Sequence, residues 1–280
     1  MQSITLNNGV EMPQLGLGVF QMNDEQVLET VPKALDAGYR LIDTASRYYN
    51  EEAVGRAIAE SGVPREELFV TTKLWFKDHG YQQTKDALRV SLDELGLDRL
   101  DLWLIHQPFG DYYGAWRAME DLLDEGLVRA IGVSNFYPDR YADLVAHNRI
   151  VPAVDQRETH VFNQQKDMLD LARRHGTVLQ AWAPLVQGDP EAHGDPALAE
   201  IAAAHGRTVA QVMLRWLIQR DIAVVAKSTH EDRLRENLDV FDFSLSGDEM
   251  ERIADLDRQQ PIAGFTHRDP RMLEMLRGLE

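Results

Sequence analysis

Short apolar runs recur along the chain, and each is followed by a segment whose apolar residues keep helical spacing. The runs are rich in β-branched side chains and occupy Leu15–Leu17, Tyr39–Ile42, Leu68–Thr72, Leu100–Ile105, Ala130–Val133, Ala153–Gln156, Val178–Trp182 and Ile222–Ala226. Their apolar character is continuous rather than alternating, which is typical of parallel strands covered on both faces. The pattern therefore predicts a buried parallel sheet of eight strands.

Amphipathic helices are predicted between these strands. The first has apolar residues at helical spacing over residues 27–35, with Asn23 and Gln26 as a capping pair and Gly38 as its stop. Pro32 lies inside this pattern and predicts a kink. The same arrangement recurs over residues 87–95 and 116–123, closed by Gly96 and Gly126 respectively. The alternation of strands and helices is thus continuous.

The unbroken array predicts a (β/α)8 barrel, an α/β TIM barrel, because parallel neighbours need crossover helices. A doubly wound sheet has the same periodicity and stays open on pattern alone. Ile4–Leu6 and Val10–Met12 flank Asn8-Gly9, which predicts an N-terminal β-hairpin ahead of the barrel. The chain has 280 residues and no linker, and a barrel typically takes about 250, so we expect a single domain over 1–280.

Composition narrows the class of protein. An apolar share of 44% supports a large core, and the lack of cysteine excludes disulfides, thiolate metal sites and thiol catalysis. No apolar run approaches the roughly 18 residues of a membrane span, and the N-terminal residues lack a signal-peptide pattern. We therefore expect a cytoplasmic monomer with no membrane partner. The net charge of −17 argues against nucleic acid as a partner but says little about a small anionic ligand.

Polar residues follow three successive predicted strands, at the end where such barrels place functional groups. Asp43, Lys73 and His106 stand at these positions, and Tyr48 lies in the loop after Asp43. Taken singly, each has an ordinary structural explanation: a helix cap, a solvated strand end, a hydrogen-bonded core histidine and a packing tyrosine. Together they meet at one mouth of the barrel.

This group of residues suits proton-coupled hydride transfer. A tyrosine, with a usual pKa of about 10, donates a proton to an alkoxide forming on a carbonyl, and a nearby lysine lowers the tyrosine pKa. An aspartate keeps the lysine charged and oriented, and a histidine hydrogen-bonds the carbonyl oxygen.

Four segments resemble the motifs of the aldo-keto reductase superfamily. LIDTASRYYNE at 41–51 is similar to its first signature, and VTTKLW at 70–75, LWLIH at 102–106 and AIGVSNF at 130–136 resemble its later motifs. The resemblance runs from about residue 4 to about residue 270 in the family's order. Bacterial 2,5-diketo-D-gluconic acid reductases are the members that the chain resembles most.

The resemblance implies a barrel, a nicotinamide cofactor and a catalytic tetrad of Asp43, Tyr48, Lys73 and His106. Tyr48 would be the general acid, because the family places its acid five residues after the aspartate, which selects Tyr48 over Tyr49.

The sequence has no dinucleotide fingerprint, since Gln21 stands where Gly16-Leu17-Gly18 would need a third glycine, and it has no P-loop or zinc-binding motif. We expect no metal. The resemblance instead implies a cofactor site made of Ser134, Asn135, Gln156, Trp182, Pro184, Leu185, Lys227, Ser228, Arg233, Glu236 and Asn237.

The family assigns these residues to parts of NADPH. The first three would bind the carboxamide, Trp182 would stack on the nicotinamide, and residues 227–237 would hold the 2′-phosphate and adenine. Without the resemblance, Trp182 is equally a core residue and the last segment a solvated helix start. Ala226 and His230 depart from the family's usual proline and arginine, so we expect NADPH to be favoured with some use of NADH.

The resemblance also implies a substrate pocket, with a wall made of Phe20, Tyr49, Trp75, His106 and Phe109. Gln107 replaces the tryptophan usual after the histidine, which makes that edge smaller and more polar. Gln187–Pro196 and Pro261–Pro270 are polar and irregular, as mobile lids would be. In the second lid, His267 and Arg268 would either meet an acidic sugar or satisfy helix ends.

These residues predict an NADPH-dependent reductase that converts aldehydes or ketones to alcohols, with a keto-sugar acid such as 2,5-diketo-D-gluconate as the named substrate. Two alternatives stay open at this point. One is an NADPH-binding sensor protein with little turnover, and the other is an NADH-preferring alcohol dehydrogenase of the same fold.

Overall fold

The structure, a computed structural model that describes residues 2–278, is built around eight parallel strands that close into a barrel. The ring runs β10-β3-β4-β5-β6-β7-β8-β9 and closes where Val224 of β10 pairs with Leu15 of β3. The strands are β3 (Leu15–Gly18), β4 (Leu41–Asp43), β5 (Phe69–Leu74), β6 (Leu102–Ile105), β7 (Ile131–Ser134), β8 (Val154–Glu158), β9 (Val178–Trp182) and β10 (Ala223–Ala226). The predicted barrel is confirmed, and the doubly wound alternative is wrong.

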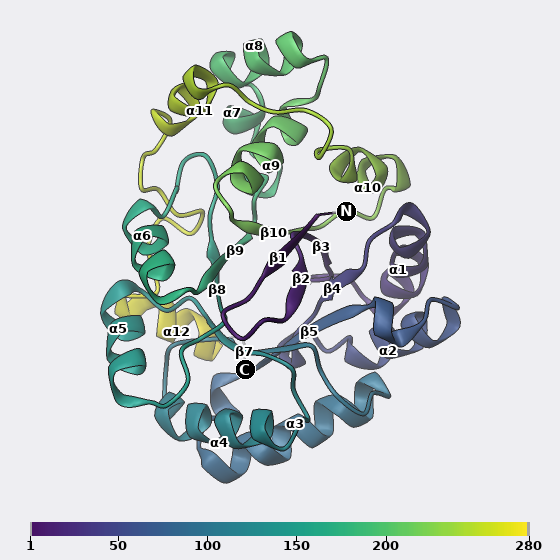
Figure 1. The fold of residues 1–280 in the computed structure, drawn as a ribbon, viewed down its shortest axis with the longest axis vertical. Coiled ribbons are helices and arrows are strands. Elements are labelled where there is room, and N and C mark those ends of the chain that lie inside the picture. Colours follow the sequence, from purple (N-terminus) through teal and green to yellow (C-terminus); the bar gives the residue numbers. More distant parts are fainter. Residues whose placement is uncertain (1, 279–280) are drawn as a thin grey trace.

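The N-terminal hairpin lies across one end of the barrel (Figure 1). Its strands β1 (Ser3–Thr5) and β2 (Glu11–Pro13) pair antiparallel, with Ile4 opposite Met12. Each strand is shifted by one residue from the predicted range, β1 toward the N-terminus and β2 toward the C-terminus. Met12 is fully buried against inward-facing residues of the barrel such as Leu41. The hairpin therefore fills the end of the barrel opposite the carboxyl ends of the strands.

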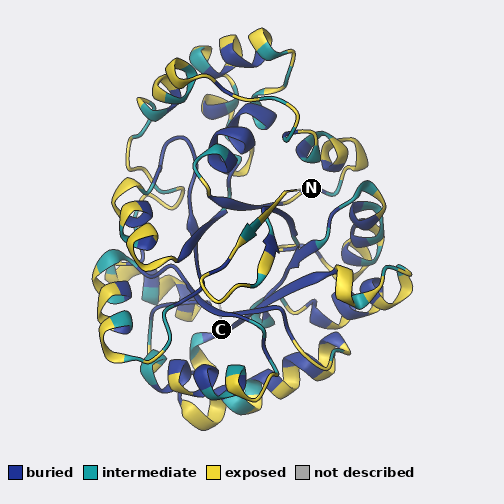
Figure 2. Cartoon of the chain, in the orientation of Figure 1, coloured by how far each residue is buried: buried dark blue, intermediate teal, exposed yellow. Residues whose placement is uncertain are grey.

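Most of the helices cover the outside of the barrel (Figure 1), while α12 lies over its mouth. They are α1 (Asp24–Ala37), α2 (Glu51–Glu60), α3 (Tyr81–Leu95), α4 (Tyr112–Asp124), α5 (Pro138–His147), α6 (Lys166–His175), α7 (Pro190–His193), α8 (Pro196–His205), α9 (Val209–Gln219), α10 (Glu231–Leu238), α11 (Gly247–Ala254) and α12 (Pro270–Gly278). Figure 2 shows the barrel strands largely buried, the hairpin strands mostly exposed, and most helices buried on the face toward the barrel. None of the helices in the described part of the chain is long and apolar enough to cross a bilayer.

The start of α1 follows its sequence pattern closely. Asn23 and Gln26 form the predicted capping box, and Gly38 ends the helix in the left-handed conformation with φ of 111°. Pro32 lies inside α1, which nevertheless continues as one helix from Asp24 to Ala37.

The first of the two predicted lids is not irregular throughout, so this prediction is wrong in part. Part of Gln187–Pro196 is ordered as α7, because Asp189 accepts a hydrogen bond from Ala192 N at 3.0 Å and Pro190 occupies the first helical position. The second lid, from Pro261 to the start of α12, is irregular as predicted. The irregular backbone over the barrel mouth is thus concentrated in the C-terminal tail.

Candidate active site

The carboxyl ends of the barrel strands surround a cavity of about 1200 Å³. Most of the predicted site residues line it, namely Phe20, Asp43, Tyr48, Trp75, His106, Ser134, Asn135, Gln156, Trp182, Pro184, Leu185, Lys227, Ser228, Arg233, Glu236 and Asn237. No group of three or more His, Asp or Glu side chains within residues 2–278 is placed to hold a metal ion. The lining combines aromatic rings, amides and charged side chains.

A buried ion pair lies at the floor of this cavity. Lys73 is fully buried at the end of β5 and donates from Nζ to Asp43 Oδ1 at 2.5 Å and to the Thr44 carbonyl oxygen at 2.7 Å. The Tyr48 hydroxyl is 3.4 Å from the same Nζ, and its ring centroid is 5.6 Å from that of His106. The four predicted residues therefore form one contiguous group.

Asp43 is held on its second oxygen as well. Gln156 on β8 donates from Nε2 to Asp43 Oδ2 at 2.7 Å and to Gln180 Oε1 at 2.8 Å. Gln156 and Gln180 are both buried, on neighbouring strands β8 and β9. Hydrogen bonds on both oxygens fix the carboxylate in the orientation that faces Lys73.

The electrostatics of the group keep Lys73 charged and Tyr48 protonated. Burial alone lowers the pKa of Lys73, but Asp43 and Tyr48 together raise it by more than burial lowers it, so its pKa lies above the usual value. Burial raises the pKa of Tyr48, and this effect exceeds the lowering by Lys73. The lysine effect expected from the sequence is present, but the expected net direction was wrong because the hydroxyl is desolvated.

His106 is neutral in these surroundings. Burial lowers its pKa well below the usual range, and the positive charges of Lys73 and Arg47 act in the same direction. The Trp75 ring packs edge-on against the imidazole with centroids 5.1 Å apart. A neutral imidazole in a cavity wall has one N–H that can donate a hydrogen bond to a bound ligand.

A second set of polar groups lies at the ends of β7 and β9. Asn135 follows β7 in the left-handed conformation, with φ of 64°, and its amide nitrogen donates to the carbonyl oxygen of His106 at 3.1 Å. Its Oδ1 accepts from Trp182 Nε1 at 3.0 Å, and Ser134 Oγ is 3.1 Å from its amide nitrogen. These contacts orient Trp182 at the cavity and link the site to the backbone beside His106.

Residues 227–237 form the end of the cavity beyond β10. Lys227 donates from Nζ to the Gln21 carbonyl oxygen at 3.3 Å, while Ser228 Oγ accepts from His230 N at 3.1 Å. Arg233 is exposed on α10 and makes no hydrogen bond or ion pair within the part of the chain that the structure describes. Glu236 accepts from Thr208 Oγ1 at 2.6 Å. Two cations thus face this end of the cavity.

The predicted substrate wall is assembled only in part. Phe20 and Trp75 line the cavity, and the Phe20 ring lies 4.9 Å from the Tyr48 ring. Tyr49 is 73% exposed and Phe109 packs behind Phe76, and neither lines the cavity. The side chains of α12 supply an apolar surface that the sequence analysis did not include.

The C-terminal tail lies over the cavity and is fixed at two points. Ile262 N donates to Glu158 Oε1 at 2.6 Å, and Arg268 pairs with Asp139 in the first turn of α5 at 2.7 Å. His267 is buried and lines the cavity, and burial lowers its pKa to about 3. Arg268 therefore forms an ion pair with a side chain of the first turn of α5 and does not line the cavity, while His267 does.

Several cavity residues were missed by sequence reasoning. Those that line the cavity are Arg47, His193, Thr208 and the α12 residues Met272, Met275 and Leu276. Gln180 was also missed, and it lies behind the lining as a hydrogen-bond partner of Gln156. Gln180 was detectable, because it shares the inward face of β9 with Val178 and Trp182 at period two. Arg47 was also detectable as the residue before Tyr48 within the first motif. The α12 residues had no local signal.

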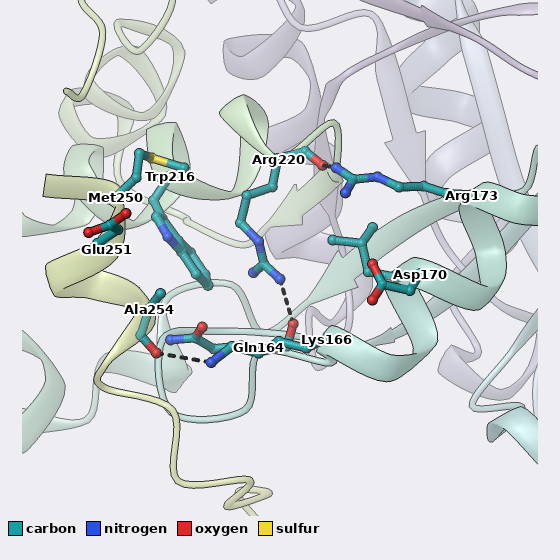
Figure 3. A pocket seen from close by; sticks show the side chains of 10 residues that line it. Gln164, Lys166, Asp170, Arg173, Trp216, Arg220, Met250, Glu251 and Ala254 are labelled. Carbon is teal, nitrogen blue, oxygen red and sulfur yellow. Dashed lines mark hydrogen bonds between the residues drawn. The ribbon is translucent and has the colours of Figure 1, made fainter. Parts of the chain in front are cut away.

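A second, smaller cavity of about 400 Å³ lies on the outside of the barrel between α6, α9 and α11 (Figure 3). Arg220 stacks over the Trp216 ring at 4.2 Å and donates to the Gln164 carbonyl oxygen at 2.9 Å (Figure 3). None of the residues around it belongs to the barrel mouth, so it is separate from the site described above.

Comparison with known proteins agrees with this geometry. The model of the Aldo/keto reductase family matches residues 12–258. The chain belongs to that family. It is 46% identical over 268 residues to morphine 6-dehydrogenase of Pseudomonas putida (91% of this chain, 90% of the relative), and 46% identical over 262 residues to glyoxal reductase of Bacillus subtilis (93% and 94%). A solved aldo-keto reductase of Bombyx mori in complex with NADP superposes with a TM-score of 0.89 at 37% identity, covering 93% of this chain and 94% of that one.

In this aldo/keto reductase family member, hydrogen bonds from the two residues after Tyr49 hold the loop that carries Tyr48. Asn50 accepts from Thr44 Oγ1 at 2.7 Å and donates to the Val19 carbonyl oxygen at 3.1 Å. Glu51 is buried and accepts from Thr72 Oγ1 at 2.6 Å, and Thr72 directly precedes Lys73. These bonds fix the loop of Tyr48 relative to the strand of Lys73.

Glu51 gives the family member a testable pH dependence. Burial raises its pKa to about 7, so between pH 4.5 and 7 the folded state keeps a proton that the unfolded chain has lost. The free energy of unfolding therefore falls as the pH rises through this window. Glu51→Gln still accepts from Thr72 but cannot ionise, so its free energy of unfolding relative to wild type rises by about 2 to 3 kcal/mol between pH 5 and pH 8.

Denaturant unfolding at the two pH values measures this difference. Glu52→Gln removes an exposed carboxyl one residue along and is the matched control for the lost charge. Parallel pH curves for Glu51→Gln and wild type would show that Glu51 is ionised in the folded protein throughout.

Proposed function

We propose that this chain is an NADPH-dependent reductase of aldehydes and ketones, with Tyr48 as the proton donor. The observation that carries the proposal is the buried Lys73–Asp43 pair beside a protonated Tyr48 and a neutral His106, all at one cavity. A carbonyl oxygen placed between the tyrosine and the histidine would receive a hydrogen bond from each. That arrangement stabilises the negative charge that develops on the oxygen during reduction.

The residues around the cavity fit a nicotinamide dinucleotide phosphate. The Gln156 amide nitrogen is used by Asp43 and Gln180, so its Oε1 remains to accept from a carboxamide, with Ser134 and Asn135 beside it. Trp182 offers a ring for stacking. When bound, NADPH supplies the hydride, and the protein holds the substrate carbonyl beside it.

The far end of the cavity fits the phosphate. Lys227 and Arg233 supply two cations there, and Arg233 has no ion-pair partner within residues 2–278 that would compete with a phosphate. Glu236 and Asn237 lie beside them for the adenine. The Bombyx mori relative is in complex with NADP, which supports this choice of cofactor.

The residues of the tetrad divide the proton chemistry among them. Tyr48 transfers its proton from Oη to the carbonyl oxygen as the alcohol forms. Lys73, whose positive charge Asp43 maintains, stabilises the phenolate left on Tyr48. His106 orients the carbonyl by a hydrogen bond. The named substrate, 2,5-diketo-D-gluconate, stays a prediction within this class.

Replacing the proton donor tests the reaction. Tyr48→Phe removes one hydroxyl and keeps the ring, so NADPH binding is retained while kcat for carbonyl reduction falls by at least about 100-fold, the usual contribution of a general acid. The assay follows NADPH consumption over a panel of aldehydes and ketones. Tyr81→Phe, which alters an exposed tyrosine on α3, is the control.

Equal rates for Tyr48→Phe and wild type would show that Tyr48 is not the acid. A wild-type protein that binds NADPH but reduces no carbonyl would favour the sensor alternative.

Removing the phosphate cation tests the cofactor. Arg233→Ala loses a charge-assisted contact with the 2′-phosphate, so the Kd for NADPH rises by about 10-fold or more while the Kd for NADH changes little. Arg235→Ala, on the same helix but paired with Glu231, is the matched control. Equal losses for the two cofactors would remove Arg233 from the phosphate site.

A further inference from the structure

Gln156 and Gln180 form an amide–amide contact in the interior of the barrel. They are paired residues of the neighbouring strands β8 and β9, and both are almost completely buried. Gln156 lines the cavity, whereas Gln180 lies behind it and does not. Gln180 can therefore act on a bound ligand only through Gln156.

The Asp43 carboxylate sets the direction of these hydrogen bonds. A carboxylate paired with a lysine only accepts, so the Gln156 amide turns its nitrogen toward Asp43 Oδ2, at 2.7 Å. The same nitrogen has a second N–H, and Gln180 Oε1 accepts from it at 2.8 Å. Gln156 Nε2 then has no hydrogen left to donate.

The orientation of Gln180 is fixed by the groups on its two sides. Its Oε1 faces Gln156, and its Nε2 is 4.0 Å from Met12 Sδ, in the hairpin that fills the other end of the barrel. Turning this amide over would bring two donor nitrogens together and would leave the second N–H of Gln156 without an acceptor. Only one orientation of Gln180 thus satisfies Gln156.

The cavity is left with one acceptor and one donor at this place. Gln156 Oε1 accepts from no group within residues 2–278, and it is the only polar atom of that side chain left for a ligand. Ser134 Oγ accepts from Asn135 Nδ2 at 3.1 Å, so its own proton is available to donate. A primary carboxamide has one acceptor oxygen and one donor nitrogen, and it matches this pair in a single orientation.

We infer that Gln180 is a positioning residue for the cofactor: it takes the second N–H of Gln156, so that Gln156 can only accept and the carboxamide must donate to it. Without an acceptor at position 180, that N–H would be free, and Gln156 would offer the cavity a donor as well as an acceptor. Fixing the side chain before binding also reduces the cost of ordering it. This inference rests on the proposed function, because it takes NADPH as the ligand.

Two cofactors that differ only in the carboxamide test the inference. The 3-acetylpyridine analogue of NADP+ keeps the carbonyl oxygen and has a methyl group in place of the NH2 group. Wild type is expected to bind NADP+ about 10-fold more tightly in calorimetric titrations, because the analogue leaves Gln156 Oε1 without a donor. Gln180→Leu is expected to reduce this preference to about 3-fold or less, because Gln156 can then turn an N–H toward the acetyl oxygen.

A conservative variant and a packing control separate positioning from a general loss of structure. Gln180→Glu, whose buried carboxyl group is expected to hold a proton, still has an oxygen that accepts from Gln156, so its preference is expected to stay within about 2-fold of wild type. Val178→Ala changes packing on the same inward face of β9 without touching the amides, and it should keep the wild-type preference.

A preference that Gln180→Leu retains, or that Gln180→Glu loses as well, would overturn the positioning role. Equal affinities of wild type for the two cofactors would also overturn it, while leaving the proposed function intact. If wild type binds neither cofactor, the proposed function fails and the inference fails with it.

Discussion

The charges and the geometry of the site depend on the buried ion pair between Lys73 and Asp43. An ammonium group without any water contact costs several kcal/mol unless its surroundings compensate. Here the Asp43 carboxylate and the Thr44 carbonyl oxygen accept from Nζ, and Gln156 holds the second carboxylate oxygen. Asp43 and Thr44 come from β4, the neighbour of the strand that carries Lys73, whereas Gln156 comes from β8 on the opposite side of the ring, so Asp43 receives both of its hydrogen bonds only when the ring is closed. Tyr48 is then held beside a charge that is already neutralised.

Barrel closure also divides the mouth into two functional halves. The amide groups and the cations assigned to the cofactor follow β7, β8 and β10, whereas the tetrad and the aromatic wall follow β3 to β6. The carbonyl of a substrate would lie at the boundary, where Tyr48 and His106 converge. The irregular tail and α12 lie above this boundary and contribute an apolar cover. The acidity of the chain is thus a property of the surface, whereas Lys227 and Arg233 line the end of the cavity where an anionic ligand would bind.

Much of this arrangement was predictable from the sequence, because parallel strands and amphipathic helices leave strong local patterns. The eight apolar runs, the Asn23 capping box and the placement of His106 directly after a strand are of this kind. Other features depend on contacts between distant segments. The pKa of Tyr48 rises because burial exceeds the effect of Lys73, and only the folded structure shows how deeply the hydroxyl is buried. Tyr49 adjoins Tyr48 in sequence but points out of the site, because the left-handed turn at Tyr49 redirects the chain.

The central claim is that Tyr48, and not His106, delivers the proton. The pH profile of kcat/KM for carbonyl reduction at saturating NADPH tests it most directly, since the two groups titrate in different ranges. Tyr48 has a pKa raised above its usual value of 10, so the account predicts a level profile from pH 6 to 9 and a loss only above pH 10. A loss with a midpoint near pH 6.5, the ordinary range of histidine, would identify His106 as the acid and contradict the account.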